Sequence, residues 1–209
     1  MQVDLLTPAD YNEVIIFFSG FGSNKSFFQH LTLPKKTLIF ISNYQNNLLN
    51  LDFLKDKKIT LIAWSMGVAM ANRFLPKNLN VIKKIAINGT LQGIDKKNGI
   101  PPAIFKYTIK NFNLEIFKKN TFENTLNSAN NFLFPKKESL IMELQNIYDT
   151  LLNIPSKEEI WDKILISRDD KIFETKYQLN AWENCKPIKI NTPHFPFFEF
   201  DDWDMLCNI

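Results

Sequence analysis

Short runs of apolar, β-branched and aromatic residues recur along the chain and predict buried strands. Each run lies between polar or glycine-containing segments, as expected for strands that are covered on both faces. The predicted strands span residues 14–18, 37–41, 59–63, 81–87, 160–166 and 187–190. Helices are expected between them, around residues 27–31, after the turn at 64–67 up to 76, and at 174–184. Strands that alternate with helices form right-handed crossovers, so we expect an α/β fold with a mostly parallel central sheet flanked by helices.

The alternation stops between residues 91 and 155, where no strand pattern is present. Two apolar stripes at helical spacing lie in this segment instead. The first contains Phe105, Ile109, Phe112 and Ile116, and the second contains Leu140, Leu144, Ile147, Tyr148 and Leu151. We therefore expect residues 91–155 to form a helical lid insertion over the carboxyl ends of the strands, and residues 1–90 and 156–209 to form the core. The alternative is that these helices simply pack on the flank of the sheet.

The composition is that of an ordinary globular domain and argues against several classes of partner. The chain has 209 residues, of which 45% are hydrophobic and 22% charged. Its net charge of +3 is too small, and its lysines too scattered, to indicate binding to nucleic acid. No leader pattern and no apolar run near the ~20 residues of a membrane span is found, so no membrane association is expected. Cys185 and Cys207 are the only cysteines and suggest no disulfide framework, so we expect a reduced, cytoplasmic setting. We also expect the protein to be a monomer.

The central run leads directly into a sharp turn that contains a serine. Residues 63–67 read A-W-S-M-G, and the small residues Gly67 and Ala69 follow Ser65 where a new helix must pass close to the strand. A strand, a tight turn and a helix around x-Ser-x-Gly are the context of a nucleophile elbow, in which the serine hydroxyl projects above the sheet. The usual first glycine is replaced by Ala63. The alternative is an ordinary strand-to-helix turn with a capping serine.

A serine nucleophile needs a base and an acid, and few residues qualify. The chain has two histidines, and we favour His194, because it follows the last predicted strand at the edge where the serine lies, over His30 on the early helix. Asp169 and Asp170 both stand at the end of a predicted strand, and either can orient the imidazole or serve as a helix cap. The chain order Ser, Asp, His is that of the α/β-hydrolases.

The remaining requirement is a pair of N–H groups that bind a developing oxyanion. The residue after the nucleophile, Met66, and the early glycine-rich loop, through Phe21, are the expected donors. Gly20 and Gly22 would allow the loop backbone to approach the substrate, although a plain strand-ending turn is also possible. No phosphate-binding loop and no metal-ligand spacing are found, so we expect neither a cofactor nor a metal.

These motifs together resemble the α/β-hydrolase superfamily and, more narrowly, the BioG-type pimeloyl-[acyl-carrier protein] methyl ester esterases of biotin synthesis. The resemblance rests on four segments and on a short chain that starts almost at the strand 14–18, which precedes the glycine-rich loop. The four segments are F-F-S-G-F-G at 17–22, A-W-S-M-G-V-A at 63–69, D-K-I-F at 170–173 and P-H-F-P-F at 193–197. The resemblance implies Ser65 as nucleophile, His194 as base and Asp170 as acid, since the family's acid directly precedes a basic-Ile-Phe stretch. It also places Ser19 where related esterases have a histidine.

The resemblance further implies a reaction and a partner. The reaction is hydrolysis of the methyl ester of pimeloyl-acyl carrier protein through a pimeloyl-serine intermediate. Lid side chains have two expected uses. Phe105, Phe112 and Phe117 would border an apolar channel for the acyl chain, and Lys106, Lys110, Lys118 and Lys119 would meet the acidic carrier protein. The alternatives are core packing and a solvated face. A thioesterase, a short-chain esterase, an acyltransferase or a non-catalytic hydrolase-like binding protein are competing functions.

Overall fold

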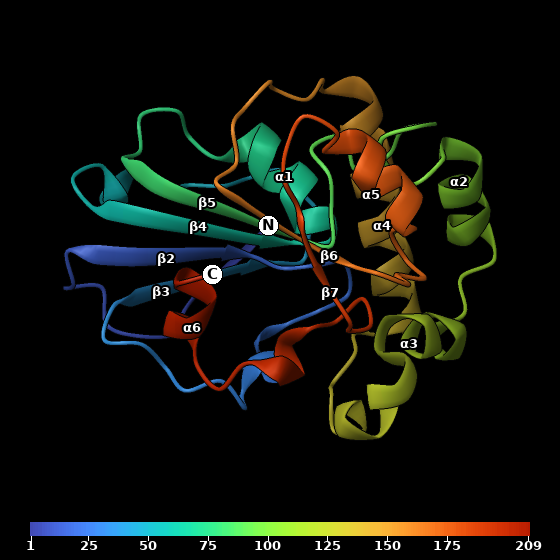
Figure 1. The fold of residues 1–209 in the computed structure, drawn as a ribbon, viewed down its shortest axis with the longest axis horizontal. Coiled ribbons are helices and arrows are strands. Elements are labelled where there is room, and N and C mark those ends of the chain that lie inside the picture. Colours follow the sequence, from blue (N-terminus) through green and yellow to red (C-terminus); the bar gives the residue numbers. More distant parts are fainter.

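A single twisted sheet of seven strands forms the centre of the molecule (Figure 1). The computed structural model describes residues 1–209, and the strand order in the sheet is β1-β3-β2-β4-β5-β6-β7. Only β1 runs antiparallel to its neighbour. The strands are β1 (Gln2–Leu5), β2 (Glu13–Phe18), β3 (Thr37–Ser42), β4 (Lys58–Trp64), β5 (Val81–Ile87), β6 (Lys163–Ser167) and β7 (Ile188–Ile190). The predicted α/β class with a mostly parallel sheet is confirmed.

Helices cover both faces of the sheet and gather at one of its ends. The α-helices are α1 (Met66–Phe74), α2 (Pro102–Lys110), α3 (Leu114–Phe122), α4 (Lys137–Asn153), α5 (Thr175–Ala181) and α6 (Trp203–Cys207). Short 3₁₀ turns occur at η1 (Lys25–Phe28), η2 (Asp52–Leu54), η3 (Glu123–Ala129) and η4 (Phe197–Glu199). In Figure 1, α2, α3 and α4 lie together at the end of the sheet where β2 and β4 finish. No helix has both the length and the apolar character needed to cross a membrane.

The central strands are apolar without interruption because both of their faces are buried. In β2, Ile16 and Phe18 belong to the core on one face, whereas Ile15 and Phe17 belong to the core on the other. The first core also contains side chains of α1 and α4, and the second contains those of η1 and α6. Adjacent side chains of a strand point to opposite faces, so a two-sided core requires a continuous apolar run.

The structure differs from the sequence prediction at the N-terminus. The first predicted strand begins at residue 14, but Gln2–Leu5 forms β1 at the edge of the sheet and pairs with β3. The side chains of this strand are mostly exposed, so it has no apolar run that would reveal it. Its pairing with the edge of β3 is a tertiary contact, which explains why the local pattern missed it.

The stripe predicted through Phe105 and Ile116 is two helices rather than one. α2 ends at Lys110 and α3 begins at Leu114, because Asn113 caps the second helix by accepting a hydrogen bond from the N–H of Ile116 (3.1 Å). Smaller shifts occur elsewhere: β6 starts three residues later than predicted, at Lys163, and the early helix is only the 3₁₀ turn η1.

Candidate active site

The turn between β4 and α1 holds Ser65 in a strained backbone conformation. Its φ is +59° and its ψ −131°, a region that non-glycine residues rarely adopt. Two glycines make the close approach possible. A Cβ on Gly67 would lie 2.2 Å from the carbonyl oxygen of Phe18, and one on Gly89 would lie 2.3 Å from that of Ser65. The sharp turn of a nucleophile elbow is therefore present, and it lifts the serine hydroxyl off the end of the strand.

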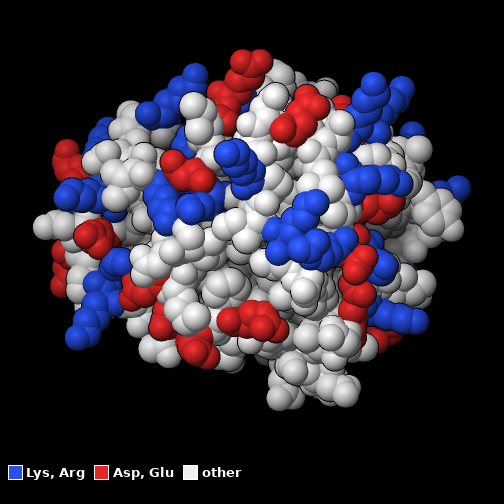
Figure 2. Space-filling view, in the orientation of Figure 1, with Lys and Arg blue, Asp and Glu red and all other residues white.

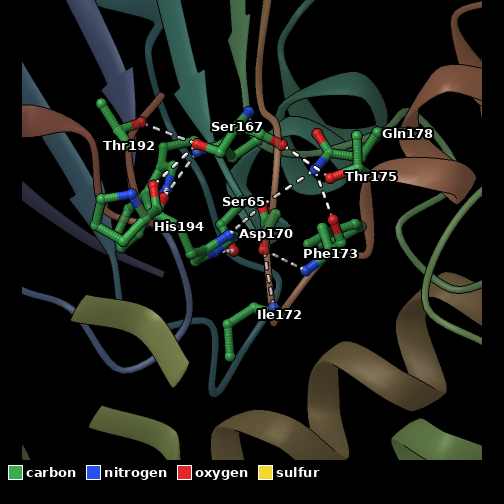
Figure 3. Close-up of polar contacts among 12 residues, drawn as sticks. Ser65, Ser167, Asp170, Ile172, Phe173, Thr175, Gln178, Thr192 and His194 are labelled. Carbon is green, nitrogen blue, oxygen red and sulfur yellow. Dashed lines mark hydrogen bonds and ion pairs between the residues drawn. The ribbon is translucent and has the colours of Figure 1, made fainter. Parts of the chain in front are cut away.

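Three side chains from distant parts of the chain form one line of hydrogen bonds (Figure 3). The Oγ of Ser65 lies 2.9 Å from Nε2 of His194, and Nδ1 of His194 lies 2.8 Å from Oδ2 of Asp170. All three residues are buried. Because the carboxylate accepts at Nδ1, that nitrogen carries the proton in the neutral ring and Nε2 is left free to accept the serine O–H.

The carboxylate of Asp170 is held on both of its oxygens. Oδ1 accepts the backbone N–H groups of Ile172 and Phe173, each at 2.8 Å. Oδ2 accepts from Gln178 Nε2 at 3.0 Å as well as from His194. Four donors thus surround an acceptor-only group, which fixes its orientation.

The structure separates the alternatives that the sequence left open. Asp169 is exposed and forms no side-chain hydrogen bond, whereas Asp170 contacts the imidazole. The only hydrogen bond of the His30 ring is the one that Nε2 donates to the carbonyl of Phe197 (2.9 Å), so His30 does not contact Ser65. Of the candidate acids and bases, Asp170 and His194 are therefore brought to Ser65.

Several residues that sequence reasoning missed anchor the His194 loop. Trp64 Nε1 and Asn88 Nδ2 each donate to the carbonyl of His194 at 2.9 Å. Ser167 Oγ donates to the carbonyl of Pro193 (2.9 Å) and accepts from Asn88 Nδ2 (2.7 Å). Asn88 follows β5 and Ser167 ends β6, so a polar residue at the carboxyl end of each buried strand was the available signal.

The two expected oxyanion donors, the N–H groups of Phe21 and Met66, have no backbone acceptor. The N–H of Phe21 donates to no other backbone group. Met66 is the first residue of α1, so its N–H has no acceptor within the helix. Gly20, the residue before Phe21, lies close to Ser65, since a Cβ on Gly20 would be 3.0 Å from Cβ of Ser65. Both N–H groups are therefore available next to the serine.

A mostly apolar cavity of about 330 Å³ opens above this site. Ser65, His194 and Met66 line it, together with Phe21 and Lys171. The predicted channel residues Phe105, Phe112 and Phe117 all line the same cavity. The ring of Phe21 packs edge-on against those of Phe112 and Phe117, with distances between ring centroids of 5.7 Å and 5.2 Å. The cavity thus lies between helices α2 and α3 and the glycine-rich loop of residues 19–23, called the oxyanion loop below.

The site contains no arrangement of side chains suited to a metal ion. No group of three or more His, Cys, Asp or Glu residues is arranged so that it could hold a metal ion. The polar groups of the site are instead a hydroxyl, an imidazole, a carboxylate and backbone amides, the set used for acyl transfer by a nucleophilic serine.

The sequence matches one protein family over nearly its whole length and is similar to two other proteins. Residues 5–206 match the family described as "Pimeloyl-ACP methyl esterase BioG". A "Malonyl-[acyl-carrier protein] O-methyltransferase" of Bacteroides fragilis is 35% identical over 196 residues, which is 87% of this chain but only 39% of that protein. An uncharacterized protein of Haemophilus influenzae is 30% identical over 201 residues, covering 92% of this chain and 93% of its own length.

Solved structures extend this similarity. The crystal structure of BioG from Haemophilus influenzae superposes with a TM-score of 0.90 and 27% identity, covering 99% of both chains. A lipase-esterase related protein of Clostridium acetobutylicum has a TM-score of 0.60 at 17% identity, covering 99% of this chain and 96% of its own. The second likeness shows the α/β-hydrolase fold alone.

Proposed function

The chain belongs to the BioG family of pimeloyl-acyl-carrier-protein methyl esterases, and from this premise we propose that Ser65, His194 and Asp170 hydrolyse the methyl ester of pimeloyl-acyl carrier protein. The observation that carries the proposal is the line of hydrogen bonds from Ser65 through His194 to Asp170 at the floor of an apolar cavity. The chain spans only 39% of the Bacteroides methyltransferase, so the activity in that protein's name is not assigned to it.

The reaction begins with attack of Ser65 Oγ on the carbonyl carbon of the methyl ester. His194 Nε2 removes the serine proton as the bond forms, and the negative oxygen of the tetrahedral intermediate accepts the N–H groups of Phe21 and Met66. His194 then gives its proton to the departing methoxide, so methanol leaves and a pimeloyl-serine ester remains. Water attacks this ester, again giving one proton to His194, and the carboxylic acid departs as that proton returns to Ser65. The acid then ionises in water.

Asp170 supports this cycle without exchanging a proton with the substrate. It keeps the proton of neutral His194 on Nδ1 and stabilises the imidazolium that forms in each tetrahedral step. Its other hydrogen bonds come from Ile172, Phe173 and Gln178, which hold the carboxylate in place while the charge on the ring changes.

The cavity accounts for the choice between the two ends of the substrate. A carrier protein is far too large for a cavity of about 330 Å³, so the thioester end stays at the mouth and the methyl ester end reaches Ser65. Burying the methylene groups of the acyl chain against Phe105, Phe112 and Phe117 contributes about 0.8 kcal/mol of binding free energy for each CH₂. In this proposal α2, α3 and α4 act as the lid expected for residues 91–155.

The carrier protein would dock on the exposed rim of α2 and α3. Ile104, Tyr107 and Ile116 line the cavity and are 49%, 69% and 59% exposed, which gives the rim an apolar surface. Lys106, Lys110 and Lys119 are exposed beside them, whereas Lys118 is paired with Glu115 at 2.9 Å. Figure 2 shows basic and acidic side chains interspersed over the face drawn, so docking would depend on these local lysines rather than on a broad basic field. We expect reversal of Lys106, Lys110 and Lys119 to glutamate to weaken turnover of the carrier substrate, while turnover of a small aryl ester stays unchanged.

The oligomeric state and cellular setting remain expectations of this proposal. We expect a monomer, because the triad, the oxyanion donors and the cavity are all built from one chain. A reducing, cytoplasmic compartment is expected because Cys185 and Cys207 are both free thiols.

The test is hydrolysis of pimeloyl-acyl-carrier-protein methyl ester, followed by the mass of the acylated carrier. Wild type should remove one methyl group, Ser65→Ala should leave the ester intact, and Ser128→Ala, which changes an exposed serine on η3, should match wild type. Serine-dependent cleavage of simple aryl esters without action on the carrier substrate would refute the substrate and leave a general esterase. Failure of a fluorophosphonate to label Ser65 would indicate a non-catalytic binding protein.

A further inference from the structure

The loop that carries one oxyanion donor is held by a carboxylate that the acyl-transfer steps do not use. Glu143 lies on α4 and is 3% exposed. Its Oε2 accepts the N–H of Gly22 (3.3 Å), and its Oε1 accepts the N–H of Tyr44 (3.1 Å). No lysine, arginine or histidine forms an ion pair with it. Burying a carboxylate that has no ion-pair partner is costly, and the two backbone N–H groups of Gly22 and Tyr44 are the groups that compensate for it.

A second side chain holds the neighbouring peptide of the same loop. Both the Oγ of Ser23 (2.7 Å) and its N–H (3.3 Å) donate to the carbonyl oxygen of Gly20. In a planar trans peptide the C=O and the N–H point in opposite directions. Ser23 therefore fixes the direction of the Phe21 N–H, which belongs to the same peptide plane as the Gly20 carbonyl.

Together these contacts restrain both peptides that adjoin the Cα of Phe21. Ser23 holds the peptide before it, and Glu143 holds the peptide after it through the N–H of Gly22. Gly22 has a φ of +69° and can rotate easily without such a restraint, because it lacks a Cβ. Leu140 of α4 also closes on this residue, since a Cβ on Gly22 would lie 2.9 Å from Leu140 Cδ2.

From this geometry we propose that Glu143 is a positioning residue, which together with Ser23 keeps the N–H of Phe21 directed at the oxyanion. Helix α4 then supports the oxyanion hole through the contact of Glu143 with Gly22. The proposal rests on the acyl-enzyme chemistry of Ser65 but not on which acyl group the enzyme accepts.

The test compares Glu143→Gln with wild type on p-nitrophenyl butyrate, a small ester that needs no carrier protein. Glutamine keeps the size of the side chain but turns one of its two acceptors into an N–H₂ donor that faces a backbone N–H. We expect kcat to fall by about tenfold to a hundredfold with KM within about twofold, since loss of one oxyanion donor is worth 10²–10³ in kcat. The rate of fluorophosphonate labelling should fall in parallel.

Asn146→Ala is the matched control. Asn146 lies on the same helix and donates to the carbonyl of Tyr44 (2.7 Å), yet it does not contact the oxyanion loop. We expect this variant to keep the wild-type kcat even if it lowers the unfolding temperature. An equal loss of kcat in Asn146→Ala would overturn the proposal, because α4 would then act by packing alone. A wild-type kcat in Glu143→Gln would also overturn it.

The Ser23 variants provide an independent test if the Glu143 variant does not fold. Ser23→Ala removes the hydroxyl contact to Gly20, and Ser23→Thr restores a hydroxyl at the same position. We expect kcat to fall severalfold in the alanine variant and to recover in the threonine variant. Equal kcat values in wild type and Ser23→Ala would refute the proposal that Ser23 holds the peptide between Gly20 and Phe21 in place. If the aryl ester results hold while the pimeloyl carrier substrate is not cleaved, the proposed substrate fails and the role of Glu143 stands.

Discussion

Replacing Asp170 by asparagine tests how the proposed triad works, because the structure dictates which way the new amide must face. The Oδ1 position accepts two backbone N–H groups, from Ile172 and Phe173, so the oxygen of the amide must remain there. The N–H₂ group then occupies the Oδ2 position and donates to Nδ1 of His194. This donation places the ring proton on Nε2, which faces Ser65 and can no longer accept the serine proton.

The expected loss of rate is large, whereas the expected loss of stability is small. A triad with the wrong imidazole tautomer loses about 10⁴-fold in kcat, or roughly 5 kcal/mol of transition-state stabilisation. Gln178 can adapt by turning its Oε1, which has no partner in the structure, toward the new amide. The variant then loses the hydrogen bond from Gln178 to the carbonyl of Phe173, which is worth about 1 kcal/mol.

The assay is kcat for an aryl ester, measured beside the thermal unfolding midpoint of each protein. Asp169→Asn changes the exposed neighbour and should match wild type in both. If Asp170→Asn keeps more than a tenth of the wild-type kcat while it remains folded, the orientation of His194 by this carboxylate is not needed and the argument is wrong. If Asp169→Asn loses the activity instead, the wrong aspartate has been assigned.

Three further substitutions have outcomes that follow from the geometry. Gly67→Ala should prevent folding or lower stability by several kcal/mol, because its Cβ would lie 2.2 Å from the carbonyl of Phe18; chemical denaturation measures this. Asn88→Ala should cost about 2–4 kcal/mol in the same assay, since buried hydrogen bonds to the N–H and hydroxyl of Ser167 are lost; a loss below 0.5 kcal/mol would contradict this. Burial raises the pKa of Glu143 to about 7, above its ordinary value of 4.5, so the stability that this group contributes is fully present below about pH 4.5 and is lost as the pH rises through about 7. Wild type should therefore lose about 1–3 kcal/mol relative to Glu143→Gln between pH 5 and pH 8.

Two ionisable groups are coupled electrostatically to Glu143 and are present in both proteins, namely the Tyr44 hydroxyl and the Met1 ammonium group. The ammonium group opposes the rise in the pKa of Glu143. Parallel stability curves for wild type and Glu143→Gln over this range would show that the carboxyl does not change its protonation on folding.

Much of the fold is readable from the sequence because it depends on neighbouring residues. The continuous apolar runs of β2, β3 and β4 follow directly from burial on both faces, and the small residues after Ser65 follow from the close passage of α1 over the Phe18 carbonyl. Strand β1 was missed because its stability comes from pairing with β3 rather than from its own pattern. The break between α2 and α3 was missed because the cap of Asn113 outweighs a stripe that continues through it.

The sequence by itself determined the order Ser, Asp, His and the local turn that holds Ser65 at the end of β4, since an elbow depends on adjacent residues. Only the tertiary structure shows that Asp170, and not Asp169, faces the imidazole 24 residues farther along the chain. The same holds for Glu143, which meets Gly22 across 121 residues. A contact between positions so far apart leaves no periodicity in the sequence, and it exists only once the sheet has brought the ends of its strands together.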